Sequence, residues 1–143
     1  MYNQNQIMRI LIFFTLALFS LGCSDKEELP VRSDIVGKWQ LIEFYADPGN
    51  GSGKFTSIKS NKTLEFSSNG DFSVKNGSMC NLDLSSNESR ISTYAIDSTD
   101  VKDYFRLKIK ECTQELYCLV QGDILTIYFP CIEGCGEKYR RIN

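Results

Sequence analysis

The sequence predicts an all-β protein, an eight-stranded antiparallel up-and-down β-barrel, and three observations support this prediction. Apolar and polar residues alternate with a period of two over much of the chain, whereas no helical period lasts for two turns. Turn-forming dipeptides separate the alternating segments. Eight such segments fit into the 121 residues that follow residue 22 of 143, which suits one domain. The competing all-β prediction is a β-sandwich.

The expected strands are short and follow one another closely. The clearest alternation lies at 104–110, where apolar side chains alternate with basic ones. Tight hairpins are expected at Asn69-Gly70 and Gly122-Asp123. The glycine-rich stretch at 49–53 lacks the following helix of a phosphate-binding loop, so we expect a mobile loop there. The eight strands are expected at residues 38–45, 63–67, 71–75, 91–96, 104–110, 116–121, 124–129 and 138–142.

The N-terminal region predicts export of the chain. Residues 10–21 are apolar except for Thr15 and Ser20, and they follow a single basic residue, Arg9. This run is too short to span a membrane, which takes about 20 apolar residues, and it has the size of a signal-peptide core. We therefore expect residues 1–22 to be a signal peptide.

The residues around Cys23 predict a lipid anchor. Ser20-Leu21-Gly22-Cys23 resembles the lipobox of bacterial lipoproteins, although Ser20 stands where leucine is usual. The acidic stretch at 24–28 resembles the export signal that sends lipoproteins of the Bacteroidetes type to the outer cell surface. The resemblance implies acylation of Cys23, a flexible tether at 23–33 and a domain at 34–143. It also implies outer-membrane localisation with surface exposure, the alternative being the periplasmic face.

Composition excludes several classes of function. After removal of residues 1–22, 15 basic and 18 acidic residues remain, so there is no basic field to attract nucleic acid. The chain has no histidine, which excludes Ser-His-Asp and Cys-His catalysis and histidine-based zinc sites. The carboxylate pairs Asp97/Asp100 and Glu133/Glu137 are expected to be solvated loop charges. We therefore expect no enzymatic activity, no cofactor and no metal.

Gly37-Lys38-Trp39 opens the first expected strand, and two arginines, Arg140 and Arg141, lie near the end of the last. This Gly-x-Trp and arginine pattern resembles that of the lipocalins and wider calycins. Within this group the chain more closely resembles the short lipocalin-like lipoproteins of Bacteroidetes, including its tail from residue 131 to 142. The resemblance implies a barrel that binds rather than catalyses.

Closure of an up-and-down barrel brings its first and last strands together. Trp39 should then lie beside the end of the last strand, where an arginine can stack on the indole within about 6 Å. Tyr139 and Arg141 share one face of the strand, and Arg140 and Ile142 share the other. We favour Arg141 as the partner of Trp39, and we expect this pair to plug one end of the barrel.

Strand order also groups the cysteines. Successive connections of a meander alternate between the two ends of the barrel, which places five thiols at the rim opposite Trp39. In an oxidising compartment we expect two disulfides and one remaining thiol, with the connectivity left open. A Cys₄ zinc site and a redox motif are the less favoured alternatives, because the spacings match neither. The five are Cys80, Cys112, Cys118, Cys131 and Cys135.

The functional hypothesis is an anchored binding module that holds a small apolar ligand in the barrel mouth. Eight strands enclose an interior that side chains just fill or that holds one small ligand. The alternative is therefore a filled barrel that serves as a structural or protein-interaction module at the cell surface. Expected partners are the membrane, through the lipid, a small hydrophobic ligand and a surface protein. The candidate wall residues, each of which could equally be plain core, are Phe55, Leu64, Phe66, Phe105 and Tyr128.

Overall fold

The computed structural model describes residues 34–143, and within them the chain forms nine β-strands and no helix. The expected signal peptide, the expected lipidation site Cys23 and the expected tether lie outside the described residues. The strands are β1 (Gly37–Ala46), β2 (Thr56–Ser57), β3 (Thr63–Phe66), β4 (Asp71–Lys75), β5 (Arg90–Ser98), β6 (Tyr104–Ile109), β7 (Leu116–Gln121), β8 (Ile124–Phe129) and β9 (Cys135–Ile142).

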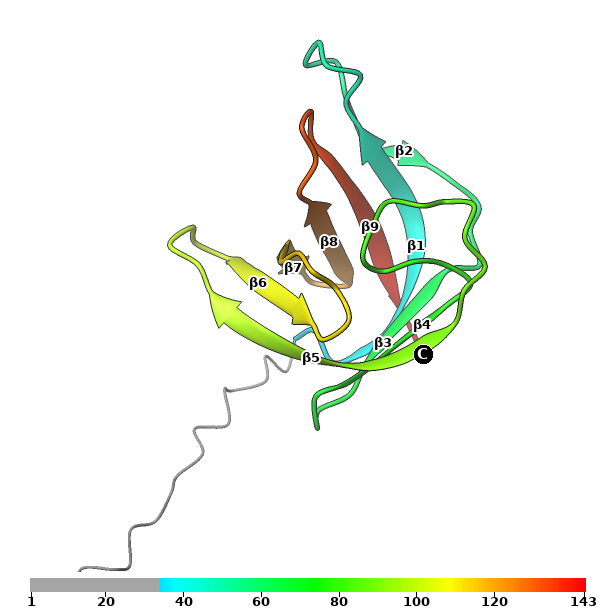
Figure 1. Cartoon of the computed structure of the whole chain (residues 1–143), viewed down its shortest axis with the longest axis vertical. Coiled ribbons are helices and arrows are strands. Elements are labelled where there is room, and N and C mark those ends of the chain that lie inside the picture. Colours follow the sequence, from blue (N-terminus) through cyan, green and yellow to red (C-terminus); the bar gives the residue numbers. More distant parts are fainter. Residues whose placement is uncertain (1–33) are drawn as a thin grey trace, which may run out of the picture.

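The strands form a closed antiparallel barrel with up-and-down order, as predicted (Figure 1). From β3 to β9 each strand pairs with the next, and β1 pairs with both β3 and β9. Because the sheet closes on itself, the sandwich alternative is wrong. Strand β2 is an addition that the sequence did not predict, and it pairs with Glu43 and Phe44 of β1.

The closing pair, β1 and β9, is the longest ladder of the barrel. Trp39 lies opposite Arg141, and the ladder runs on to Ala46 opposite Cys135. A β-bulge lies between Leu41 and Glu43. Strand β9 therefore begins three residues earlier than the sequence predicted, a difference that matters for the interior.

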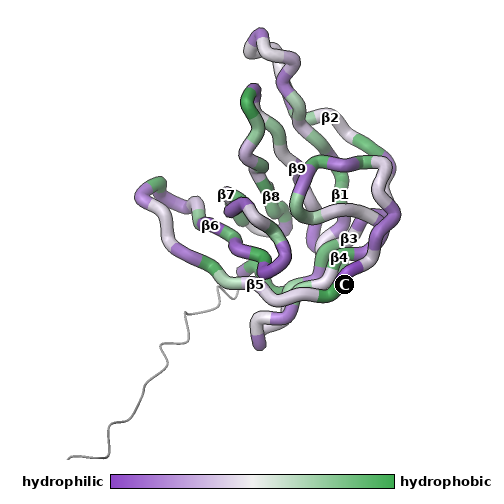
Figure 2. Tube along the Cα trace, viewed as in Figure 1, coloured by the Kyte–Doolittle hydropathy of each residue, from purple (hydrophilic) through white to green (hydrophobic). Residues whose placement is uncertain are grey.

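The core lies inside the barrel and follows the alternation of the strands. Along β6, Phe105, Leu107 and Ile109 are buried, whereas Lys108 is exposed, and the hydropathy alternates in the same way (Figure 2). The interior is occupied by large side chains with less than 2% exposure, which is the filled state that eight strands allow. These side chains are Trp39, Tyr139, Lys62, Phe66, Phe105, Ile35, Leu41, Leu64, Leu107, Leu116, Leu125 and Ile127.

The glycine-rich loop that follows β1 is organised by Asp47. Oδ1 of Asp47 accepts hydrogen bonds from the backbone N–H groups of Gly49, Asn50 and Gly51, and Oδ2 accepts one from Gly53. These hydrogen bonds, that from Gly53 foremost, hold the pKa of Asp47 below its usual value. The loop at 49–53, which we expected to be mobile, is thus held in one conformation by hydrogen bonds to Asp47.

Candidate ligand site at the open rim

The closed end of the barrel is built around Trp39. The side chain is fully buried, and its indole N–H donates to the carbonyl of Ile35 at 2.8 Å. The guanidinium carbon of Arg141 lies 4.1 Å from the Trp39 ring centroid, so the expected contact is present. Arg140 is exposed, which leaves Arg141 as the stacking partner.

Gly37 allows Arg141 to approach this closely. Its φ of +134° is rare for residues with a side chain, and a Cβ there would lie 2.6 Å from Nη1 of Arg141. Nη1 and Nη2 of Arg141 donate to the carbonyls of Val36 and Asp34, both at 2.6 Å. The Gly-x-Trp pattern therefore has a physical reason: the glycine leaves room for the arginine that covers the tryptophan.

The opposite rim carries two disulfides, as the strand order predicted. Cys80 is bonded to Cys112 with their Cα atoms 5.2 Å apart, and Cys131 is bonded to Cys135 with theirs 5.9 Å apart. Cys118 is buried within β7 and belongs to neither disulfide. The first disulfide ties the β4–β5 connection to the β6–β7 turn, and the second closes the β8–β9 connection.

A buried ion pair lies in the interior below this rim. Nζ of Lys62 is 2.8 Å from both carboxylate oxygens of Glu137, and the hydroxyl of Tyr139 donates to Oε2 of Glu137 at 2.5 Å. Lys62 is 2% exposed and Glu137 is fully buried. The expectation that Glu137 is a solvated loop charge is therefore wrong, whereas Glu133 is exposed. The error follows from starting β9 at residue 138, because the true strand points Glu137 inward with its alternate neighbour Tyr139.

Burial sets the protonation of this cluster. Removal from water lowers the pKa of Lys62, and the negative charge of Glu137 opposes that shift. Burial raises the pKa of Tyr139 well above its usual value, and the adjacent carboxylate raises it further. Tyr139 therefore stays a hydrogen-bond donor to Glu137 throughout the physiological range.

Three of the five candidate ligand residues belong to the core. Leu64, Phe66 and Phe105 face the interior and are at most 1% exposed. Phe66 packs against Phe72 and Tyr94, with ring centroids 5.0 and 5.1 Å apart. These three residues fill the barrel, and they do not line an opening.

The other two candidates, Phe55 and Tyr128, lie on the outer wall. Tyr128 alternates with the buried Ile127 and Phe129, so it points away from the interior. The ring of Phe55 lies 6.3 Å from that of Tyr128 and 5.4 Å from that of Tyr45. The structure thus separates the five candidates into an inner and an outer group, and it does not bring them together at the mouth.

The barrel wall is incomplete near the open rim, between β5 and β6. Strand β5 pairs with β4 through Arg90–Thr93 and with β6 only from Tyr94 onward. Beyond a last backbone hydrogen bond from Lys110 to Thr93, the two strands diverge. The β4–β5 connection folds over this gap and is held there by the Cys80–Cys112 disulfide.

A cavity of about 280 Å³ lies at this gap, and we call it the mouth pocket. Its apolar wall consists of inward-facing side chains that are 2–4% exposed, and its polar residues are two serines, an asparagine and three ionisable groups. This pocket was not predicted from the sequence, although the length of the β4–β5 connection was a signal. The lining residues are Phe72, Val74, Gly77, Ser78, Met79, Cys80, Asn81, Glu88, Arg90, Ser92, Ile109 and Glu111.

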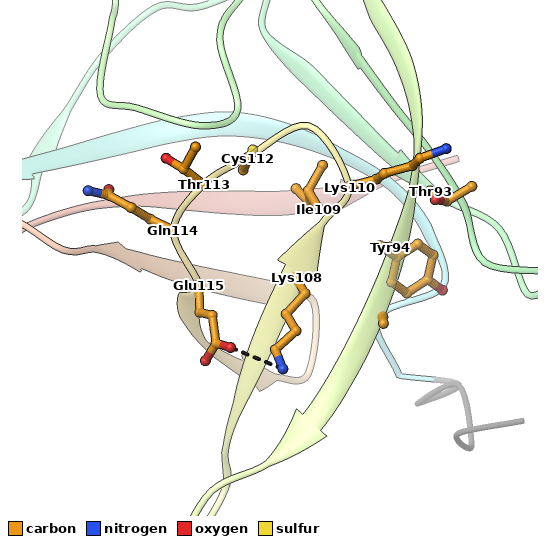
Figure 3. Close-up of a pocket in the computed structure, with 10 residues that line it drawn as sticks. Thr93, Tyr94, Lys108, Ile109, Lys110, Cys112, Thr113, Gln114 and Glu115 are labelled. Atoms are coloured by element: carbon orange, nitrogen blue, oxygen red, sulfur yellow. Dashed lines mark ion pairs between the residues drawn. The ribbon is translucent and has the colours of Figure 1, made fainter. Parts of the chain in front are cut away.

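A second, more open depression lies beside β5, β6 and the β6–β7 turn (Figure 3). Nζ of Lys108 bridges Oε1 of Glu115 at 3.0 Å and Oδ2 of Asp97 at 2.6 Å, so charged groups already satisfy one another here. The side chains of Thr113 and Gln114 extend from the turn, as Figure 3 shows. The depression is more open than the mouth pocket, which makes it a weaker candidate.

Comparison with known families, with characterised proteins and with solved structures found no match to this chain. The closed antiparallel eight-stranded barrel is consistent with a lipocalin-like fold. Among residues 34–143, no helix is long and apolar enough to cross a membrane. In the same residues, no three cysteine or carboxylate side chains are grouped so that they could hold a metal ion.

Proposed function

We propose that this protein is a lipid-anchored, lipocalin-like binding module of the Bacteroidetes type that takes a small, largely apolar ligand in the mouth pocket. The observation that carries the proposal is the mouth pocket itself. It is a cavity with an apolar wall and a few polar groups at its edge, in a barrel whose interior is otherwise occupied by side chains. Ligand sites commonly combine these features.

The proposed anchor orients this site. Chain segment 34–36 lies at the closed end, where Arg141 holds its carbonyls, so a lipid on Cys23 attaches the barrel by that end. The mouth pocket lies at the opposite end and would face away from the membrane. Replacement of Cys23 by alanine should move the protein from the membrane fraction to the soluble fraction of the cells. Retention in the membrane fraction would contradict the anchor.

Ligand binding is tested with a neutral apolar dye, N-phenyl-1-naphthylamine, and the mature chain carrying Cys23→Ala. Val74→Phe adds volume to the pocket wall and should abolish saturable dye binding. Ile91→Phe adds the same ring on a side chain that is 84% exposed, and it should leave binding intact. Thermal unfolding of both variants checks that the barrel persists. Equal dye binding by both variants would place the site elsewhere.

The outer wall supports a second candidate function, a protein-interaction module. Tyr45, Phe55, Tyr104 and Tyr128 form a continuous row of ring contacts between 5.4 and 6.3 Å, and the nearby Tyr117 is 50% exposed. Aromatic residues of this kind are enriched at protein interfaces. Absence of dye binding together with loss of a surface partner in Tyr117→Ala would favour this function.

A further inference from the structure

The mouth pocket has an excess of negative charge at its edge. Its ionisable side chains are Glu88, Arg90 and Glu111. Nε of Arg90 is 2.8 Å from Oε2 of Glu88, so these two charges offset each other. Glu111 accepts a hydrogen bond from the hydroxyl of Ser92, which carries no charge. One carboxylate therefore stands at the edge without a cation to balance it among the pocket side chains.

Two other lysines near the pocket, Lys62 and Lys110, do not line it. Lys62 packs beneath Gly77 of the β4–β5 connection, but its ammonium is directed to Glu137 in the interior. Lys110 precedes Glu111 in the chain, yet it lines the neighbouring depression and not the mouth pocket. The charge of Glu111 is thus available to a ligand.

Part of the pocket wall is apolar. Phe72, Val74, Met79 and Ile109 supply this part, with 2–4% exposure each. The hydrogen bond between Ser92 and Glu111 places the unbalanced carboxylate where the β6–β7 turn meets β5, and Ser78 and Asn81 add polar groups from the β4–β5 connection. At about 280 Å³ the pocket lies near the lower end of the range for small-molecule sites, roughly 300–1,000 Å³, so its size suits a compact amphiphile.

We infer that the mouth pocket selects small amphiphiles with a cationic head, the apolar body lying against Val74 and Ile109 and the head pairing with Glu111. This inference rests on the proposed function and names its ligand class. Because Glu111 is exposed and screened by solvent, the charge adds selectivity more than affinity.

Three eight-carbon probes that differ only in the head test the inference: octylammonium, octanol and octanoate. Calorimetric titration into the mature Cys23→Ala chain at low salt should show octylammonium binding about fivefold tighter than octanol, with octanoate weakest. The preference should shrink at high salt. Glu111→Gln should remove the preference for octylammonium while octanol binds as before. Asp100→Asn, which removes an exposed carboxylate from the β5–β6 turn at the other end, should change neither.

The outcomes separate the two proposals. Binding of none of the three probes would overturn the proposed function. Equal binding of all three, or a preference for octanoate, would overturn the ligand class and leave the proposed function standing. A preference for octylammonium that persists in Glu111→Gln would refute the pairing of the cationic head with Glu111.

Discussion

The buried pair of Lys62 and Glu137 offers a quantitative test of the interior. Replacement of Lys62 by methionine keeps most of the side-chain volume and removes the ammonium that contacts both oxygens of Glu137 at 2.8 Å. The carboxylate would then remain fully buried with the hydroxyl of Tyr139 as its hydrogen-bond donor. Loss of one partner of a buried ion pair costs about 3–5 kcal/mol of unfolding free energy, because the other charge is left uncompensated.

The double variant Lys62→Met/Glu137→Gln measures the interaction energy between the two side chains. It removes both charges, so its cost should fall well below the sum of the two single costs, with a coupling of about 2–3 kcal/mol.

Urea unfolding at neutral pH with the disulfides intact, followed by the fluorescence of the single tryptophan, measures these quantities. A cost below about 1 kcal/mol for Lys62→Met would refute the reasoning, because an exposed pair is worth no more than that. Additivity of the two substitutions would refute it equally. Either result would mean that the two side chains reach water in solution.

Three further predictions follow from the ends of the barrel and from Tyr139. Urea unfolding should show that Trp39→Ala lowers the free energy of unfolding by about 3–5 kcal/mol and that Arg141→Ala lowers it by less. The double variant should show a coupling energy above about 0.5 kcal/mol, and additive effects would mean that the two side chains do not stack. Removal of the Cys80–Cys112 disulfide, which spans 32 residues, should lower the free energy of unfolding by at most about 4 kcal/mol. Removal of the Cys131–Cys135 disulfide, which spans 4 residues, should lower it by about 2 kcal/mol. Equal costs would contradict the chain-entropy account of disulfide stabilisation. Because the pKa of Tyr139 is raised in the folded state, its contribution to stability is complete below about pH 10 and is lost as the pH rises further. The melting temperature should therefore fall more steeply from about pH 9 to about pH 11.5 for the wild type than for Tyr139→Phe. Identical pH profiles of the two proteins would argue against a buried phenol.

The fold could be predicted because period-two alternation and turn chemistry are local signals. The strands at Asp71–Lys75, Leu116–Gln121 and Ile124–Phe129 agree with the prediction to the residue. The pairing of Trp39 with Arg141 also followed, because closure of a meander fixes which ends meet. In each case a short segment, or the strand order alone, contains the information.

The interior and the mouth pocket depend on contacts that no local pattern contains. Lys62 and Glu137 are 75 residues apart, and Lys62 comes from a connection where alternation gives no direction. Tyr128 lies in the apolar run Ile124–Phe129, so its hydrophobicity does not reveal which face it occupies. The mouth pocket lies where β5 pairs with β4 but not with β6, because its pairing with β6 begins only at Tyr94. The register between these strands is set by the whole sheet.

The position of Arg141 has a mechanical consequence for an anchored protein. A pull on the chain ahead of residue 34 reaches the barrel through the segment whose carbonyls Arg141 holds, at Asp34 and Val36. Behind that clamp, β1 lies between β3 and β9, and the load acts along its length. The hydrogen bonds of both ladders would then be sheared together instead of being broken one after another. With the proposed lipid on Cys23, the end that stacks an arginine on a tryptophan would also be the end through which tension enters the barrel.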